Sequence, residues 1–388
     1  MEVRSWTRIG LAAVAAAGAT QVALAQVSTL VALEPTQRKD GLMVSRPGLE
    51  SNLKALLGQT VTVASTEDLT DTMRATRSGA HDIFIAPPQV VASALAHGYE
   101  LIGSTEAQEE YVLVGRPHMN KPADLKAGRI YLPQQDSIYT YLARGMLTAH
   151  GLSFKDLRQV HYVREPQAGL TALDMGMAEA TVIRKRDWEA WLQNNPGKAR
   201  ALAQSGPVPG GFSVAVKKDL PAEQRARLAK WFGTSATTCG LKNVASHSDA
   251  AQYERVAQLG TFTPNALPGA RLVTAAEVQK LVAEGAVVVD TRTEKEFKAR
   301  RLPTARFVPY VEKSLKDVAY DAAVDDFSGL KALDPSRPTV FLCNGAECWK
   351  SYKASKAALA AGFGKVYWFR GGVPEWEKAG LALAKGGA

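Results

Sequence analysis

The stretch Thr339-Val-Phe-Leu-Cys-Asn-Gly-Ala-Glu-Cys-Trp-Lys-Ser351 runs from an apolar segment directly into a loop that carries two cysteines. Residues 339–342 have the pattern of a buried strand, and residues 352–361 have the pattern of a helix. Loop amides and the start of a helix stabilise the thiolate form of a cysteine at such a strand end. The same amides can hold an anionic substrate or a persulfide. The stretch therefore predicts a strand, a loop and a helix, with Cys343 as a nucleophile.

The segments on either side of this stretch add further strands and helices. Thr274-Ala-Ala-Glu277 forms a capping box, in which the hydroxyl and the carboxylate satisfy amides at a helix start. The other predicted elements are a helix that ends near residue 283, a strand over 287–289 that leads into Asp290, a helix over 294–300, a strand over 366–368 and a last helix that carries Trp376.

Several motifs of this region occur in the order and spacing of one known family. They are Asp290-Thr-Arg292 with Glu296-Phe297, Leu302-Pro-Thr-Ala305, Ala361-Gly-Phe363, and Arg370-Gly-Gly-Val-Pro-Glu-Trp376 with Gly380. Together with the Cys343 loop, they make residues 272–383 resemble a rhodanese domain. The resemblance implies a three-layer α/β domain with a parallel sheet. It also implies a sulfurtransferase, in which Cys343 takes sulfur as a persulfide from a donor such as thiosulfate and passes it to a thiophilic acceptor.

The cysteine loop departs from the common form of the family. Gly345 comes one residue earlier, the stretch to Ser351 is longer, and Lys350 could supply a positive charge that the family places before the serine. Glu347 is unfavourable for a dianion unless it points outward. Asp290 is expected to order the turn below the loop, and Trp376 is expected to lie in the core. Arg292 and Arg370 either approach a bound anion or satisfy carboxylates and backbone carbonyls. The predicted active-site loop contains Asn344, Gly345, Ala346, Glu347, Trp349, Lys350 and Ser351.

Cys348 lies five residues after Cys343 and leaves three possibilities open. The two sulfurs form a disulfide, or Cys348 attacks a persulfide or sulfenate on Cys343, or Cys348 packs as a small apolar residue at the helix start. An oxidising compartment permits the first two and implies a periplasmic redox partner. Two thiols without a nearby histidine are too few for a metal site, so neither a metal nor a cofactor is predicted. Cys239 stands alone and is expected to be a buried, unreactive thiol.

The region before residue 260 alternates short apolar strands with helical patterns, which predicts an open α/β architecture. The predicted strands are 61–63, 83–85, 111–114, 129–132, 160–163, 181–183 and 212–216, and the predicted helices are 69–77, 89–97, 138–149, 168–175 and 221–231. The segment 260–270 combines glycine, proline and asparagine with little periodicity. We therefore expect a linker over 261–271 between an N-terminal domain, residues 26–260, and a C-terminal domain, residues 272–388.

Three motifs carry a second resemblance, which covers about residues 30–258. They are Arg77-Ser-Gly79 followed by His81-Asp-Ile-Phe-Ile-Ala-Pro87, then Lys121-Pro-Ala-Asp-Leu-Lys-Ala-Gly-Arg-Ile130, then Gln134-Gln-Asp-Ser-Ile-Tyr139. Their order resembles the periplasmic solute-binding proteins of the phosphate/phosphonate type. The resemblance implies two α/β lobes that close on a ligand, with the third motif as the loop that opens a helix toward it.

A helix N-terminus offers unpaired amides and partial positive charge, which suit an oxyanion. Ser137 and Thr140 supply hydroxyls there, whereas Asp136 departs from the family and would repel a divalent anion. Asp136 caps the helix that begins near Ser137, points away from the ligand, or receives a protonated ligand. The predicted ligand site of the N-terminal domain contains Gln135, Ser137, Tyr139 and Gln167, and the predicted ligand is a small anionic solute.

The first 25 residues have the pattern of a secretory signal. Arg4 and Arg8 precede an uncharged, alanine-rich stretch, and Ala23-Leu-Ala25 predicts cleavage before Gln26. A retained membrane anchor is the alternative, although the stretch is short and diluted by polar residues; no later segment is apolar enough to span a membrane. The sequence thus predicts a periplasmic protein.

The net charge of +9 comes without a long basic block or interleaved aromatic residues, which argues against a nucleic-acid partner. The predicted function is an exported sulfurtransferase with a fused solute-binding module, whose partners are a small-molecule sulfur donor and acceptor. The alternative is a non-catalytic binding or redox-sensing protein that uses the Cys343/Cys348 pair.

Overall fold

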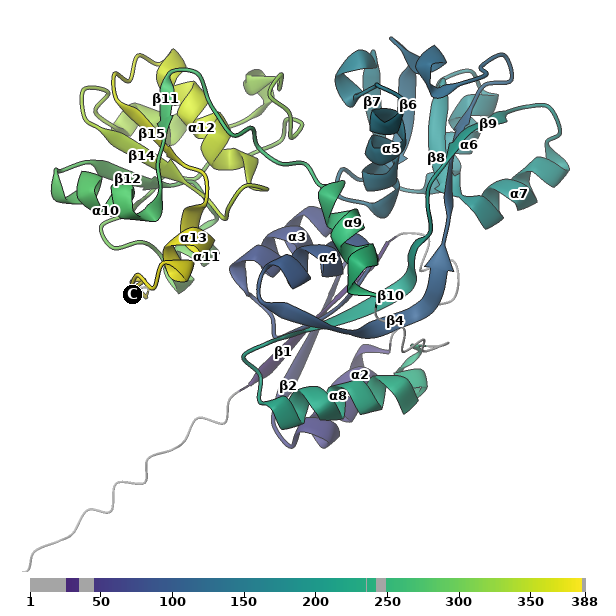
Figure 1. Cartoon of the computed structure of the whole chain (residues 1–388), viewed down its shortest axis with the longest axis horizontal. Coiled ribbons are helices and arrows are strands. Elements are labelled where there is room, and N and C mark those ends of the chain that lie inside the picture. The colour runs from purple at the N-terminus through teal and green to yellow at the C-terminus, as the bar shows by residue number, and fades with distance from the viewer. Residues whose placement is uncertain (1–25, 35–44, 235, 242–248, 386–388) are drawn as a thin grey trace, which may run out of the picture.

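The described part of the chain forms three five-stranded sheets (Figure 1). The computed structural model describes residues 26–34, 45–234, 236–241 and 249–385. The predicted signal segment, residues 1–25, lies outside them. Among the described residues, no helix is long and apolar enough to cross a bilayer.

The first sheet has the order β2-β1-β3-β10-β4, in which β1 pairs parallel with β2 and β3, and β10 pairs antiparallel with β3 and β4. Helices α3 and α4 pack on one face, whereas α2 and α8 pack on the other. The bounds are β1 Val27–Ala32, α2 Arg46–Leu57, β2 Val61–Thr66, α3 Leu69–Ser78, β3 Ile83–Ala86, α4 Pro88–Ala96, β4 Tyr99–Glu109, β10 Val208–Lys217 and α8 Ala222–Thr234.

The second sheet has the order β7-β6-β8-β5-β9, with β5 antiparallel to both of its neighbours. One apolar cluster contains residues of both sheets, including Phe84 of β3 and Leu132 of β6, so the two lobes share a core. The bounds are β5 Tyr111–Gly115, β6 Arg129–Pro133, α5 Ile138–Ala149, β7 Gln159–Val163, α6 Pro166–Asp174, β8 Ala180–Arg184, α7 Lys185–Asn194, β9 Arg200–Gln204 and α9 Ala250–Gln258.

The third sheet belongs to the C-terminal region, has the order β11-β15-β14-β12-β13 and is entirely parallel. Its central strands β15, β14 and β12 are buried between α10 and α13 on one face and α12 on the other, which makes three layers. The predicted fold class is therefore confirmed for both regions. The bounds are β11 Ala270–Leu272, α10 Ala275–Ala283, β12 Val287–Asp290, α11 Glu294–Ala299, β13 Arg306–Phe307, β14 Thr339–Leu342, α12 Trp349–Ala360, β15 Val366–Phe369 and α13 Gly372–Lys378.

Most predicted elements occur within a few residues of their expected bounds. The capping box at Thr274 is present, because its hydroxyl accepts from the amide of Glu277 and the Glu277 carboxylate accepts from the amide of Thr274. Helix α12 begins at Trp349, three residues before the predicted start, so Cys348 becomes its N-cap. The described residues also contain the 3-10 turns Pro122–Leu125, Phe154–Asp156, Ala236–Cys239, Ala322–Val324 and Ser328–Ala332.

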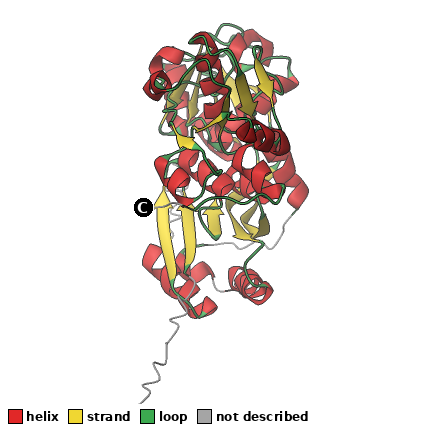
Figure 2. Cartoon of the chain, turned by 90° about the vertical axis from the view of Figure 1, so that its left-hand side faces the viewer, coloured by secondary structure: helices red, strands yellow, loops and turns green. Residues whose placement is uncertain are grey.

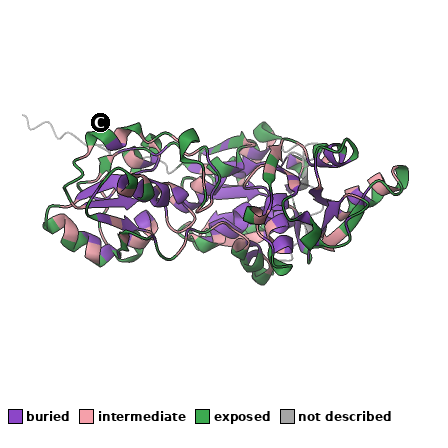
Figure 3. Cartoon of the chain, turned by 90° about the horizontal axis from the view of Figure 1, so that it is seen from above, coloured by how far each residue is buried: buried purple, intermediate pink, exposed green. Residues whose placement is uncertain are grey.

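The C-terminal region is docked on the first lobe, beside α3 (Figure 1). The polar contacts between the C-terminal region and the two lobes include Arg77 with Glu347, Asp136 with Lys316, and the Arg300 guanidinium with the carbonyl of Ser78. Figure 2 shows helices covering the strands of each unit, and Figure 3 shows the strands buried and the outer helices exposed. The end of α3 and the entrance of α5 therefore lie against the C-terminal region.

Candidate active site

The Cys343 loop is positioned by β14 and by the start of α13. Strand β14 ends at Leu342, and the carbonyl of Cys343 accepts a hydrogen bond from the amide of Val373 at 3.0 Å. Gly372 has φ +56°, and an added Cβ there would collide with the carbonyl of Cys343. The Arg370-Gly-Gly motif thus includes a glycine because the backbone of α13 passes directly against the cysteine loop.

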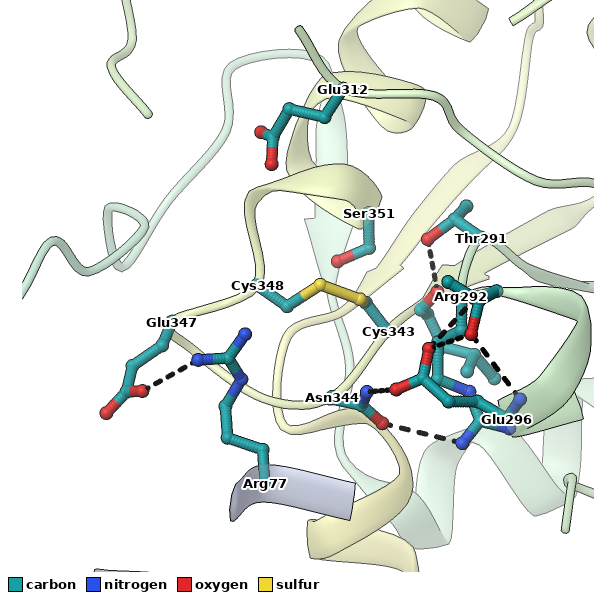
Figure 4. Close-up of a disulfide and its surroundings, with 12 residues drawn as sticks. Arg77, Thr291, Arg292, Glu296, Glu312, Cys343, Asn344, Glu347, Cys348 and Ser351 are labelled. Carbon is teal, nitrogen blue, oxygen red and sulfur yellow. Dashed lines mark hydrogen bonds and ion pairs between the residues drawn. A yellow bond between two sulfur atoms is a disulfide. The ribbon is translucent and has the colours of Figure 1, made fainter. Parts of the chain in front are cut away.

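Cys343 and Cys348 are joined by a disulfide across the loop (Figure 4). Their Cα atoms are 6.1 Å apart, within the usual span for such a bond, and both residues are buried. Of the three possibilities that the sequence left open for Cys348, the structure contains the first. A nucleophilic thiolate on Cys343 therefore requires reduction of this bond.

The floor of the loop is a buried network around Arg292. Its guanidinium donates twice to the carboxylate of Asp290, with a shortest distance of 2.7 Å, and once to Asn344 Oδ1 at 3.4 Å. Asn344 in turn donates to Glu296 Oε1 at 2.6 Å. The side chain of Arg292 is only 1% exposed. Of the two predicted roles for Arg292, the satisfaction of a carboxylate is the one that the geometry supports.

The linker holds the outer side of the loop. The backbone amide of Thr263 donates to the carbonyl of Ala346 at 2.9 Å, and the Trp349 indole donates to the carbonyl of Thr261 at 3.0 Å. Arg370 donates to the hydroxyl and to the carbonyl of Thr263. Arg370 therefore binds the linker and does not line the cavity beside the cysteines. Ser351 is buried and accepts a hydrogen bond from the Trp368 indole.

A cavity of about 300 Å³ lies in front of the disulfide, and residues of both regions line it. Glu347 points away from the cysteines toward Arg77, whose Nη1 lies 3.2 Å from its carboxylate. Burial lowers the pKa of the Lys350 ammonium, and the charge of Arg74 lowers it further. The lining residues are Asp68, Thr70, Asp71, Arg74, Arg77, Arg292, Glu296, Glu312, Lys316, Cys343, Glu347, Cys348, Trp349 and Lys350.

The predicted ligand loop of the N-terminal domain has its helix start filled by the chain itself. Ser137 is the N-cap of α5 and accepts from the amide of Thr140, so the prediction that Asp136 caps this helix is wrong. The amide of Ile138 donates to Glu34 Oε1 at 2.9 Å. The side chain of Glu34 therefore binds one of the helix-start amides that were predicted to bind an oxyanion.

Asp136 pairs with the C-terminal region. Both of its carboxylate oxygens accept from the Lys316 ammonium, at 2.9 and 2.7 Å, and one also accepts from Thr70. Burial would raise the pKa of Asp136, but the charge and hydrogen bonds of Lys316 and the hydroxyl of Thr70 hold it below its usual value. Burial raises the pKa of Glu34 to about 7, against the lowering effect of its hydrogen bonds from Ile138 and Gln89.

The other residues predicted for this ligand site make contacts that are unrelated to one another. Tyr139 is buried and packs edge-on against Tyr111. Gln135 is half-buried in the turn before α5, and Gln167 lies in the first turn of α6, where its carbonyl accepts from Thr171. The buried polar groups that converge on this loop are instead Glu34, Gln89 and Lys316, which the sequence analysis did not identify.

Cys239 is buried, and burial raises the pKa of its thiol, as expected for an unreactive cysteine. Over the described ranges, no group of three or more His, Cys, Asp or Glu side chains is placed to hold a metal ion.

Each of the two regions matches a known protein family. The family of phosphonate periplasmic substrate-binding proteins of ABC transporters matches residues 31–260, and the rhodanese-like domain matches residues 274–379. Both predicted resemblances are confirmed. No curated protein matches the chain by sequence.

Solved structures resemble the chain at low identity. PhnD1 from Prochlorococcus marinus, in complex with methylphosphonate, is 14% identical with a TM-score of 0.47, and the match covers 61% of this chain and 97% of that one. A binding protein component of a phosphonate ABC transporter from Pseudomonas aeruginosa is 14% identical with a TM-score of 0.45, covering 61% and 85%. The aliphatic sulphonate binding protein SsuA from Escherichia coli is 17% identical with a TM-score of 0.39, covering 60% and 77%.

Proposed function

Because the chain belongs to the family of phosphonate-type periplasmic substrate-binding proteins and carries a rhodanese-like domain, we propose that it is an exported sulfurtransferase that acts through Cys343. One observation carries this proposal: Cys343 lies between the end of β14 and the start of α12, beside a cavity, and the side chain of the N-cap residue Cys348 makes no capping hydrogen bond. Unpaired amides at this position stabilise a thiolate or a persulfide anion.

The reaction begins with reduction of the Cys343–Cys348 disulfide. A dithiol partner in the periplasm transfers two electrons and two protons to the two sulfurs and is itself oxidised to a disulfide. The Cys343 thiolate then attacks the outer sulfur of thiosulfate, which forms a persulfide on Cys343 and releases sulfite. A thiophilic acceptor such as cyanide removes the outer sulfur as thiocyanate and restores the thiolate.

Cys348 provides a second exit for the sulfur. Its thiolate attacks the inner sulfur of the Cys343 persulfide, forms the disulfide that the structure contains and releases hydrosulfide. The dithiol partner then reduces the disulfide again. In this cycle Cys348 is a resolving thiol rather than a packed apolar residue.

The remaining parts of the chain take the following roles. Residues 1–25 are a signal removed before Gln26, residues 26–260 bind a small solute, residues 261–271 are the linker, and residues 272–388 form the sulfurtransferase domain. For the solute we keep a small anion, with one condition from the geometry: it must displace Glu34 from the amide of Ile138 to reach the start of α5. Family membership supports a periplasmic location.

The test is thiosulfate-to-cyanide sulfur transfer by the reduced mature protein, with intact mass measured after thiosulfate treatment. We expect turnover and a mass increase of one sulfur atom. Cys343→Ser should lose both, whereas Cys239→Ser is the matched control and should keep both, because that thiol is buried and does not line the cavity. Loss that followed Cys348→Ser alone would reverse the assignment within the loop.

The disulfide itself supports a second candidate, a binding protein that senses redox state through the Cys343/Cys348 pair. It requires no sulfur transfer. Absence of turnover and of a persulfide with every donor, together with reversible closure of the disulfide by a dithiol/disulfide buffer, would favour this candidate over the enzyme.

A further inference from the structure

The wall of the cavity that faces the cysteines comes from α3 of the solute-binding domain. Arg77, in the last turn of α3, reaches across to the cysteine loop, and its side chain is only 6% exposed. Figure 4 shows its guanidinium between Glu347 and the disulfide. Its Nη1 donates to Glu347, whereas its buried Nε has no hydrogen-bond partner among the described residues. A buried guanidinium with an unused N–H donor therefore faces the cavity.

Most other charges on the cavity wall are already satisfied. Arg292 is held by Asp290, and Lys316 is held by Asp136. Among the carboxylates, Glu312 pairs with Lys353, Glu296 accepts from Thr293 and Asn344, and Asp68 accepts from the amide of Asp71.

Lys350 is the second cation with unused donors. It stands in the first turn of α12, next to the cysteines, and makes no hydrogen bond or ion pair with other described residues. Burial and the charges of Arg74 and Arg77 lower the pKa of Lys350, whereas the charges of Glu312 and Glu296 raise it, so charged groups from both domains act on this ammonium. Arg74 is paired with Asp71, whereas Arg77 and Lys350 keep N–H donors that no other described residue uses, so an anion can bind in the space that these two cations share.

We infer that Arg77 of the solute-binding domain and Lys350 of the rhodanese-like domain together bind the anionic sulfur donor, a small divalent oxyanion of sulfur, in the cavity between the two domains. This inference rests on the proposed function, which it extends by naming the groups that bind the donor. Guanidinium groups match oxyanions through paired hydrogen bonds, and Arg77 has its Nε available for one.

Glu347 then acts as an internal competitor for the same guanidinium. It holds Arg77 through a single contact at 3.2 Å, and its own side chain is 16% exposed. A bound donor takes over this contact, and Glu347 keeps the hydrogen bond that its carboxylate accepts from the Ser93 hydroxyl at 3.5 Å. The loop carries an acidic residue beside an anion site because that residue neutralises Arg77 while the site is empty.

Two substitutions that break the same ion pair should therefore act in opposite directions. Arg77→Gln removes the cation that the donor uses, whereas Glu347→Gln removes the competitor and keeps the cation. If the Arg77–Glu347 pair only docked the two domains, both substitutions would weaken donor binding alike.

The experiment measures thiosulfate binding by calorimetry to the Cys343→Ser protein, which can neither form the disulfide nor turn over. We expect Arg77→Gln in this background to weaken binding about 10-fold or more, as for the loss of one charge-assisted hydrogen bond. Glu347→Gln should strengthen it several-fold, and Lys350→Gln should weaken it. Arg227→Gln is the matched control, since Arg227 is an exposed arginine on α8 that pairs with Glu223 away from the cavity.

The outcomes separate this inference from the proposed function. Absence of thiosulfate binding to Cys343→Ser, equal affinity of Arg77→Gln and Arg227→Gln, or weaker binding by Glu347→Gln would each overturn the inference, even if the wild-type protein transfers sulfur from thiosulfate. Binding that depends on Arg77, without any persulfide on the reduced wild-type protein, would support the anion site and overturn the sulfurtransferase. Arg77→Lys, which keeps the charge, should recover part of the affinity and thus exclude misfolding as the cause of a loss.

Discussion

Two helices of this protein begin in the same way, after a strand and a short loop, but different groups lie at their first turns. Strand β6 leads through Gln134–Ser137 into α5, and strand β14 leads through Cys343–Cys348 into α12. At α5, Ser137 caps the helix and Glu34 accepts from the amide of Ile138. At α12, the N-cap is Cys348, and its side chain makes no capping hydrogen bond. Side chains of the protein itself therefore bind amides at the start of α5, whereas the N-cap side chain of α12 binds none.

Each domain also contributes a cation that pairs with a carboxylate in the loop before the other domain's helix. Lys316 of the C-terminal domain binds both oxygens of Asp136, and the two side chains are 7% and 5% exposed. Arg77 of the N-terminal domain binds Glu347 through one contact only. The first exchange is a buried, fully engaged ion pair, whereas the second leaves donors unused. One contact of this interface is therefore fully engaged in docking the domains, whereas the other keeps N–H donors that a ligand could use.

The largest expected effect comes from breaking the Asp136–Lys316 pair. Asp136→Asn or Lys316→Met leaves one charge buried without its partner, which typically costs about 3–5 kcal/mol. The double variant should lose less than the sum, because no unpaired charge remains. Urea unfolding of the four proteins gives the coupling energy.

The control for this cycle is Lys298→Met, which breaks an exposed pair with Glu294 on α11. Exposed pairs contribute about 0–1 kcal/mol. A destabilisation by Asp136→Asn that is no larger than that of Lys298→Met would show that the buried pair does not stabilise the docked arrangement.

The second prediction concerns pH and the carboxylate that fills the α5 entrance. Burial raises the pKa of Glu34 from 4.5 to about 7, so the folded protein holds this proton where the unfolded chain releases it. The contribution of Glu34 to the free energy of unfolding is therefore complete below pH 4.5, and it is lost as pH rises through 7. The change is about 3 kcal/mol across this window.

Glu34→Gln keeps an oxygen for the amide of Ile138 and removes the titration. Relative to the wild-type protein, this variant should gain about 3 kcal/mol of unfolding free energy between pH 4.5 and pH 8. Urea unfolding of both proteins at several pH values measures the difference. Parallel profiles would mean that Glu34 is not protonated in the folded state near neutral pH.

The sequence predicted the elements whose pattern is local. The apolar run 339–342 and the periodic segment 138–149 match β14 and α5 at both ends. Strand β4 was not predicted, because Gly103 and its polar neighbours give no strand pattern by themselves. It is a strand because it pairs with β10 over residues 99–109. Tertiary pairing thus overrode weak local propensity.

The residues of the candidate site likewise fall into those that a local sequence pattern predicts and those that it does not. The Cys343 loop could be predicted because strand, cysteine and helix start follow one another in the chain. Arg77 was noticed only as a helix end, and Glu34 and Lys316 were not noticed at all. Their partners lie 270, 104 and 180 residues away in the sequence, so no spacing rule connects them. The use of Lys316 and Arg77 depends on how the two domains dock, which local patterns do not contain.

The smallest expected effect tests the caps of the two helices directly. Cys348→Ser and Cys348→Ala both lack the disulfide, but only serine can accept from an amide in the first turn of α12. The serine variant should therefore be more stable than the alanine variant by about 1 kcal/mol under reducing conditions. Ser137→Ala, which removes an existing cap from α5, should cost a similar amount. Thermal unfolding in excess dithiol measures all three proteins. Equal stability of the two Cys348 variants, with a normal loss in Ser137→Ala, would mean that the first amides of α12 are already satisfied and are not available to a thiolate or an anion.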